Sequence, residues 1–424
     1  MLRILHTGDW HLGAQLDRVS REQEHLFFLD WLLDYFERES IDVLVIAGDV
    51  FHHAQPSAEA LALYYGFLAK LAKTRLRQIV IIGGNHDSAA RLDAPNLILS
   101  ELNIHVVGGL TADERSWERC VCPVFGEDPE TPQAVFLAVP FIHEYRLGIR
   151  TTARSPQDIS KDMHAAFSRI YTKVSDLARG RWPGAPLVAL GHLTCGSELG
   201  SPEVAVHQMD SIGGLSPNIF DERITYVALG HLHQMCGPRL DQTWYSGSPI
   251  PINITEAATS CYVMKVVLGG PPPKNEDYSA LRHGAYLSRV KLPTWRQLMR
   301  VEGSLEALVV ALKKLAWKEP LPPLVYPVIE VERYQPGIEA ELHKALKDFP
   351  AKERPRLVRC QQNASISAEE ALLHKQETPP LKELTPEEVF LIMYHQRYQE
   401  EPRPAILSAF RSLVDGVIRD EQHT

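Results

Sequence analysis

Short apolar runs without polar alternation recur through about the first 265 residues, and each run ends in a cluster of small and polar residues. The runs lie at 4–5, 43–47, 79–82, 187–190 and 226–229. Runs of this kind are typical of strands that are covered on both faces. The pattern therefore predicts sheets buried inside a layered domain.

Helical patterns separate the early strands. Ser20 and Gln23 are expected to form a capping box ahead of the apolar segment 26–36. A second helix is expected over 58–72. This alternation predicts an α/β layered sandwich, with more strand-dominated sequence after Ala134 and an end to the β pattern near Val267.

A second module follows the Gly- and Pro-rich stretch 269–273. Its expected strands lie at 286–292, 326–332 and 356–360, and its helices lie at 305–315, opened by Ser304, and 338–349. A polar stretch with two prolines then predicts a linker, and helix-start signals at 385–388 predict C-terminal helices, the last over 405–418. We expect four parts, at 1–268, 275–362, 363–382 and 383–424.

Composition places the chain among ordinary folded proteins and says little about its ligands. It has 424 residues, of which 45% are hydrophobic and 23% charged, and six scattered cysteines without CxxC spacing. It lacks a secretory-type N-terminus and any apolar run of about 18 residues, so we expect a cytoplasmic protein without a membrane span. The net charge is −9, yet 270–360 holds 16 Lys and Arg against 11 Asp and Glu. An acidic body with a basic module can still bind a polyanion, so charge alone decides nothing.

Five strand ends present side chains that bind metals. They are Asp9, His11, Asp49, Asn85, His86, His192, His231 and His233. Each is unremarkable alone, but side chains at the carboxyl ends of strands converge on one crevice in α/β folds. Nitrogen and oxygen donors without thiolate suit Mn²⁺, Fe²⁺ or Zn²⁺, and the number of candidates fits two ions with one bridging carboxylate. A metal-held water would supply the nucleophile that no Ser or Cys motif supplies here.

The order and the residues of these motifs resemble those of the calcineurin-like metallophosphoesterase superfamily. In detail they resemble those of its DNA double-strand-break repair nuclease family. The strings that carry the likeness are 4–13, 47–51, 84–87, 191–194, 228–233, 247–251 and 383–390. The likeness covers nearly the whole chain. It implies a four-layered α/β/β/α sandwich, a small α+β DNA-capping domain and C-terminal helices.

The resemblance also implies a role for each residue. One ion would be held by Asp9, His11, Asp49 and His233, and the other by Asp49, Asn85, His192 and His231. His86 would face the scissile phosphate, Asp87 would orient His86, and His52 would help to position the phosphate. His53, beside it, is either part of this group or a solvated loop residue.

The implied activity is hydrolysis of DNA with two Mn²⁺ ions per chain, for which Mg²⁺, Fe²⁺ or Zn²⁺ could substitute. It would include 3′–5′ exonuclease activity on duplexes and endonuclease activity on single strands and hairpins, in DNA repair, recombination and replication. Two alternatives stay open: a stand-alone phosphodiesterase acting on nucleotides or RNA, and an adaptor whose metal site has decayed. The sequence after Asp49 lacks the Asp-Arg-Gly of phosphoprotein phosphatases, and the intact ligand set argues against an adaptor.

The partners implied by the resemblance are DNA, a second copy of the chain and a coiled-coil ATPase, in a two-plus-two assembly at the nucleoid. The segments 58–72 and 95–102 contain more apolar residues than one buried helix face requires. This excess favours pairing of two copies, although core packing explains it equally well. The C-terminal helices would dock on the ATPase or fold back on the second module. No GxxxxGK[ST] string occurs, so this chain has no ATP site of that type.

Overall fold

The structure, a computed structural model, describes most of the chain. The described residues are 1–152, 154–196, 214–237, 242–272, 277–331, 338–364 and 386–398, with 400, 402–403, 406–407 and 410. Two compact units divide it, the first formed by Met1–Ile329 with Pro336–Gln361 and the second by Glu330–Gln335 with Gln362–Thr424. Each is described by itself.

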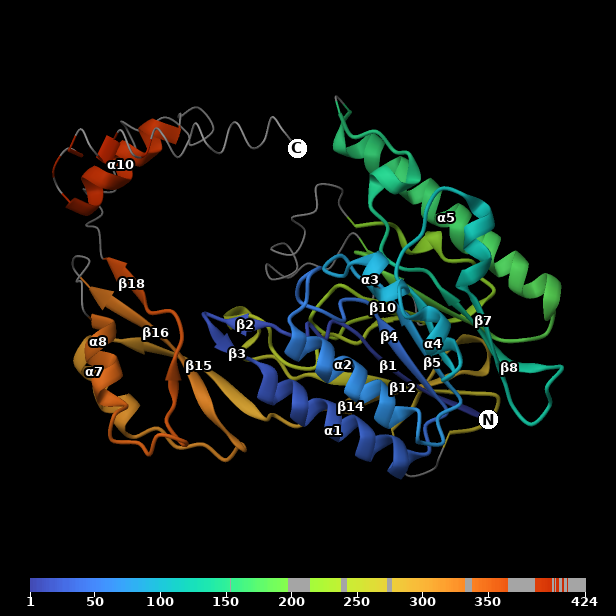
Figure 1. The fold of residues 1–424 in the computed structure, drawn as a ribbon, viewed down its shortest axis with the longest axis horizontal. Helices are drawn as coiled ribbons and strands as arrows, with labels where there is room; N and C mark the ends of the chain where they lie inside the picture. Colours follow the sequence, from blue (N-terminus) through green and yellow to red (C-terminus); the bar gives the residue numbers. More distant parts are fainter. Residues whose placement is uncertain are drawn as a thin grey trace. The chain divides into compact units, whose positions relative to one another are not determined.

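Two large sheets form the body of the first unit (Figure 1). The seven-stranded sheet has the order β13 (Ser279–Ala280), β14 (Tyr286–Lys291), β12 (Tyr262–Leu268), β1 (Leu2–Thr7), β4 (Val43–Ala47), β5 (Gln78–Ile82) and β6 (Ile104–Val107). The five-stranded sheet has the order β11 (Thr243–Tyr245), β10 (Ile224–Gly230), β9 (Leu187–His192), β8 (Pro132–Ala138) and β7 (Val121–Phe125). A small hairpin joins β2 (Gln15–Leu16) to β3 (Val19–Ser20).

Helices cover the outer face of each sheet (Figure 1). They are α1 (Glu22–Glu39), α2 (Ala58–Leu71), α3 (Ala89–Asp93), α4 (Asn96–Ser100) and α5 (Pro156–Arg181). Leu5, Leu44 and Ile81 belong to the core that packs on α1 and α2, whereas Ile4 and Val45 belong to the core shared with the second sheet. Successive residues of a strand point to opposite faces, so strands apolar at every position need two covered faces. The predicted layered α/β/β/α sandwich is confirmed.

The long helix α5 is absent from our sequence-based expectation, which placed mainly strands after Ala134. It begins with Pro156 behind the N-cap Ser155, whose side chain accepts a hydrogen bond from Asp158 N. Its buried residues follow helical spacing: Ile159, Met163, Phe167, Ile170, Tyr171, Val174, Ser175 and Ala178. The many polar residues between them hide this stripe from a search for apolar runs.

The capping box expected at the start of α1 is wrong. The helix begins at Glu22, and Ser20 Oγ accepts from Glu22 N at 3.2 Å rather than from Gln23 N. Gln23 Oε1 instead accepts a hydrogen bond from Arg296 Nη2 at 3.1 Å. A long-range polar contact therefore takes the side chain that the local motif would have used.

The second module contains β15 (Arg296–Gly303), α7 (Leu305–Lys313), β16 (Leu321–Val331), α8 (Ile338–Ala345) and β17 (Arg356–Leu357). β15 and β17 both pair with β16 in parallel, and Ser304 caps α7 by accepting from Ala307 N. The strand expected at 286–292 forms as β14, but it pairs antiparallel with β12. The first sheet therefore continues past Val267 to Lys291, because an antiparallel neighbour needs only a short connection.

The second unit contains α10 (Pro386–Tyr398), as the helix-start signals predict, and the short strand β18 (Gln361–Ala364) starts at the last residue of the first unit. The expected linker after residue 364 and most of the helix expected at 405–418 lie outside the described residues. All six cysteines are free thiols. Among the described residues, no helix is both long and apolar enough to span a membrane.

Candidate metal centre

The strand ends of both sheets bring the expected side chains together. Asp9 and His11 follow β1, Asp49 follows β4, and Asn85 follows β5 in the first sheet. His192 ends β9, and His231 and His233 follow β10 in the second sheet. Potential ligand atoms lie within 4.8 Å of one another in the group Asp9, His11, His233 and again in the group Asp9, Asp49, His192.

Asp9 belongs to both groups, and Asp49, a member of the second, also lies close to a histidine of the first. The Oδ2 atom of Asp49 is 3.6 Å from His11 Nε2 and 3.4 Å from His192 Nε2, while its Oδ1 atom accepts a hydrogen bond from His86 N at 2.9 Å. One carboxylate oxygen thus faces a histidine of each group. This is the position that a bridging ligand would occupy.

Potential ligand atoms crowd together around Asp49. His192 Nδ1 donates to Ala47 O at 2.9 Å, so a neutral His192 presents a lone pair at Nε2, and that atom lies 3.0 Å from Asn85 Oδ1. His233 Nδ1 donates to Glu256 Oε1 at 2.9 Å, and its Nε2 atom lies 3.0 Å from His11 Nε2. The Nε2 lone pair of a neutral His192 and the Asn85 oxygen are both acceptors, and they repel unless a proton or a metal ion lies between them. The donor set therefore fits divalent metal ions.

The backbone is bent to place these groups. Asp9, His11, Asp49 and His231 have φ angles of 51°, 49°, 48° and 98°, in a region that non-glycine residues rarely adopt. Such strain persists where surrounding structure enforces it, commonly at functional sites. A Cβ on Gly84 would lie 2.1 Å from Asp49 Oδ1, so this motif position requires glycine.

Burial and neighbouring charges shift the pKa values of the carboxylates and of His192 in the metal centre. Burial raises the pKa of Asp9 to about 7. Burial alone would lower the pKa of His192, but the neighbouring Asp49 carboxylate raises it to about 9. Burial would raise the pKa of Asp49, yet the charges and hydrogen bond of His192, with His11, hold it well below its usual range. Without a metal ion, the charge of the Asp49 carboxylate is balanced by a proton on His192, which again fits a site built for positive charge.

His86 and His52 lie beside the metal-ligand candidates. His86 Nδ1 donates to His52 O at 2.9 Å, and their rings stack with centroids 5.7 Å apart. His52 Nδ1 is 3.3 Å from His11 Nδ1, and burial lowers the pKa of His52 to about 4. His53 is exposed, with its ring centroid 4.5 Å from that of His52.

Asp87 does not orient His86 in the way that we expected. Its carboxylate accepts from the backbone N–H groups of Val50, Phe51 and Gly84, at 3.1, 2.9 and 2.9 Å. Three backbone donors in reach outcompete one ring nitrogen, because each would otherwise be left unpaired. Asp87 thus ties the loop after β4 to the loop after β5, and the carbonyl of His52 orients His86.

Three supporting residues escaped the sequence reasoning. Glu256 holds His233 by its Nδ1–H, Ser248 Oγ donates to Asp9 O at 3.0 Å, and His25 Nε2 donates to Trp10 O at 2.8 Å. Ser248 lies in the motif 247–251, which could have identified it. Glu256 follows no strand and belongs to no motif, so only the folded chain reveals it.

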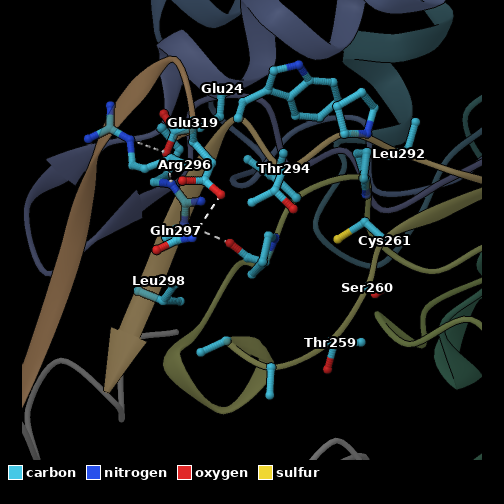
Figure 2. Close-up of a pocket in the computed structure, with 18 of the residues that line it drawn as sticks. Glu24, Thr259, Ser260, Cys261, Leu292, Thr294, Arg296, Gln297, Leu298 and Glu319 are labelled. Carbon is cyan, nitrogen blue, oxygen red and sulfur yellow. Dashed lines mark hydrogen bonds and ion pairs between the residues drawn. The ribbon is translucent and has the colours of Figure 1, made fainter. Parts of the chain in front are cut away.

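A separate pocket of about 310 Å³ lies where β15 meets the nearby end of α1. Figure 2 shows Arg296 and Gln297 on one side of it and Thr259, Ser260 and Cys261 on the other. The buried Glu24 carboxylate forms ion pairs with Arg296 Nε at 3.0 Å and with the Nε atom of Arg21 at 2.6 Å. These pairs connect the second module to α1.

Comparison with known proteins identifies the class. Residues 2–235 match the family described as calcineurin-like phosphoesterase, and residues 294–398 match the type 5 capsule protein repressor C-terminal domain, designated SbcD_C. The SbcD subunit of the nuclease SbcCD from Rhodobacter capsulatus is 32% identical over 82% of this chain and 85% of its own length. The Escherichia coli K12 protein of the same name is 30% identical over 92% of each chain, and that of Bacillus subtilis is 30% identical over 65% and 68%.

The chain therefore belongs to the calcineurin-like phosphoesterases, the metal-dependent hydrolases of phosphoester bonds. Within this class it belongs to the SbcD family, the nuclease subunits of SbcCD.

Proposed function

We propose that this chain is the nuclease subunit of a DNA end-processing complex. It hydrolyses DNA phosphodiester bonds and works with an SbcC-type coiled-coil ATPase in repair and recombination. The observation that carries the proposal is the position of Asp49 Oδ2, 3.6 Å from His11 Nε2 and 3.4 Å from His192 Nε2, at the junction of two donor groups. The similarity to SbcCD nuclease subunits along the chain supports DNA as the substrate.

We assign two Mn²⁺ ions to this centre. Asp9, His11, Asp49 and His233 would hold one, and Asp49, Asn85, His192 and His231 the other. When bound, such a pair supplies a metal-held hydroxide and stabilises charge on the phosphate oxygens. Mg²⁺, Fe²⁺ or Zn²⁺ could occupy the same donors.

The protein's own groups complete the reaction. His86 donates through Nδ1 to the His52 carbonyl, and when its ring also carries a proton at Nε2, that atom would be the donor for the leaving oxygen. The ring of His52 stacks on that of His86, and His52 helps to position the phosphate. Asp87 fixes the two loops that carry Asp49 and His86, so its role is positioning rather than proton transfer.

We also propose a division of labour along the chain. The nuclease domain extends to the end of β14 at Lys291, the residues from 294 to 361 form the DNA-capping domain, and the C-terminal helices dock on the ATPase. Two copies pair through the region of α2 and α4. Leu97 and Ile98 are 88% and 70% exposed there, which is costly for large apolar side chains without a partner.

A hairpin-ended DNA duplex tests the proposal. With Mn²⁺, the full chain should cut it, and the partner ATPase with ATP should change the rate. His86→Ala should lower cutting by roughly 100- to 10,000-fold, with Mn²⁺ content and DNA binding unchanged. If only a small chromogenic phosphodiester is hydrolysed, the chain is a nucleotide-type phosphodiesterase. If His86→Ala loses metal, His86 is a ligand.

A further inference from the structure

A line of aromatic rings leads away from the metal centre along the segment after β8. The ring of Phe141 lies edge-on to that of His192, with centroids 6.3 Å apart, and edge-on to His143 at 4.8 Å. His143 in turn stacks on Tyr145, with centroids 5.3 Å apart and planes 19° from parallel. We call Phe141, His143 and Tyr145 the aromatic ridge.

The ridge is anchored to the loop that carries Asn85 and His86. Phe141 N donates to Gly83 O at 2.9 Å, and the neighbouring Ile142 is 1% exposed in the main core. The far end is held by Ala112 N, which donates to Arg146 O at 3.0 Å. These backbone hydrogen bonds hold both ends of the segment that carries the rings.

The outer part of the ridge faces solvent although folding gives no reason for it. Tyr145 is 67% exposed, and His143 is exposed as well. Burying large aromatic side chains is among the most favourable contributions to folding, so two stacked rings that stay exposed point to a ligand that covers them. Phe141 is half-buried and can be explained by packing alone.

Cations accompany these rings. The Arg146 guanidinium lies 5.9 Å from the centroid of Tyr145, and the exposed Arg150 follows two residues after Gly148, where this turn ends. Glu144 is the acidic residue in this turn. Aromatic rings interleaved with arginines, beside a phosphodiester-cleaving centre, match the chemistry of single-stranded nucleic acids, whose bases stack and whose phosphates bind cations.

We propose that the aromatic ridge is a stacking subsite for unpaired nucleotides of the DNA strand held in the active site. Tyr145 and His143 stack on bases next to the scissile phosphate, and Arg146 contacts the backbone. The subsite favours frayed, hairpin and single-stranded substrates over fully paired ones, since a base inside a duplex has no free face. This inference rests on the proposed nuclease function and adds its substrate preference.

Kinetic measurements on a DNA substrate and on a small phosphodiester test the subsite. Tyr145→Ala should raise KM for an oligonucleotide with a single-stranded overhang roughly 5- to 100-fold, the usual effect of losing one base stack. Its kcat should change little, and hydrolysis of bis(p-nitrophenyl) phosphate should match that of the wild type. Tyr145→Phe is the matched control: it keeps the ring and loses only the hydroxyl, which accepts from Arg146 Nε at 3.4 Å, so a KM close to the wild-type value would assign the effect to stacking.

A fluorescence measurement separates stacking from a general defect. In a His86→Ala background that does not cut, an overhang carrying 2-aminopurine should lose fluorescence on binding, and the added Tyr145→Ala should restore it. Equal KM and equal quenching in Tyr145→Ala and Tyr145→Phe would overturn the subsite. An equal loss on the small ester would also overturn it, since Tyr145 would then support the metal centre. A wild-type chain that hydrolyses the small ester but no DNA would instead refute the nuclease function.

Discussion

The two halves of the metal centre are held in place by different means. In the half with His192, the backbone fixes the ring through the Ala47 carbonyl, and a Cβ on Gly48 would lie 2.3 Å from His192 Nδ1. In the half with His233, side chains do so, since the Glu256 carboxylate binds the ring and His52 lies beside His11. The first arrangement can be changed only by crowding the backbone, whereas the second can be adjusted by single side chains.

Crowding the backbone-held half should have the largest effect. Gly84→Ala places a Cβ 2.1 Å from Asp49 Oδ1, so it should displace the bridging carboxylate and lower Mn²⁺-dependent hydrolysis of bis(p-nitrophenyl) phosphate at least about 100-fold. Gly180→Ala in α5 is the control, because nothing lies within 4 Å of its added Cβ. Normal activity in Gly84→Ala would show that the loop relaxes without cost.

The side-chain-held half should respond in a graded way. Glu256→Ala should weaken binding of one of the two ions by about 10- to 100-fold, as losing a carboxylate behind a metal-binding histidine commonly does. Glu256→Gln should weaken it less, because an oxygen still accepts from His233 Nδ1. Calorimetric Mn²⁺ titration measures both steps. Equal weakening of both ions would contradict the separation into halves.

The support behind Asp9 and His11 should make stability depend on pH. Burial lowers the pKa of His25 to about 3, while its ring donates to the Trp10 carbonyl. Between pH 6.5 and 3 the unfolded chain binds a proton that the folded chain excludes, so the free energy of unfolding falls as the pH falls, by up to about 1.4 kcal/mol per pH unit. His25→Gln should flatten this slope in urea unfolding at several pH values. An unchanged slope would mean that other groups, such as the similarly buried His6, dominate.

Sequence reasoning found the parts of the centre that depend on strand ends. Asp9, Asp49 and His192 follow apolar runs, and the carboxyl ends of such strands must converge. It missed what depends on long-range pairing. Gln23 belongs to a local capping pattern yet binds Arg296, and Asp87 follows His86 yet binds three backbone groups. Only the folded chain decides which partner comes within reach.

The same limit applies to the fold. The apolar runs of β4 and β5 are unmistakable, whereas α5 buries one residue in three or four and resembles a polar segment. β14 was predicted as a strand, but which sheet it joins depends on pairing with β12 across a Pro-rich connection. The local sequence pattern predicts whether a segment is a helix or a strand better than it predicts which strands lie beside it.

The central claim is that two ions share Asp49. Elemental analysis of Mn²⁺ bound per chain, after equilibrium dialysis, tests it most directly on the wild type, His233→Ala and Asp49→Ala. The account predicts two ions in the wild type, one in His233→Ala and none in Asp49→Ala, with Asp30→Ala, an exposed carboxylate paired with Lys70, as the control that retains two. A single ion in the wild type, or one ion retained by Asp49→Ala, would contradict it.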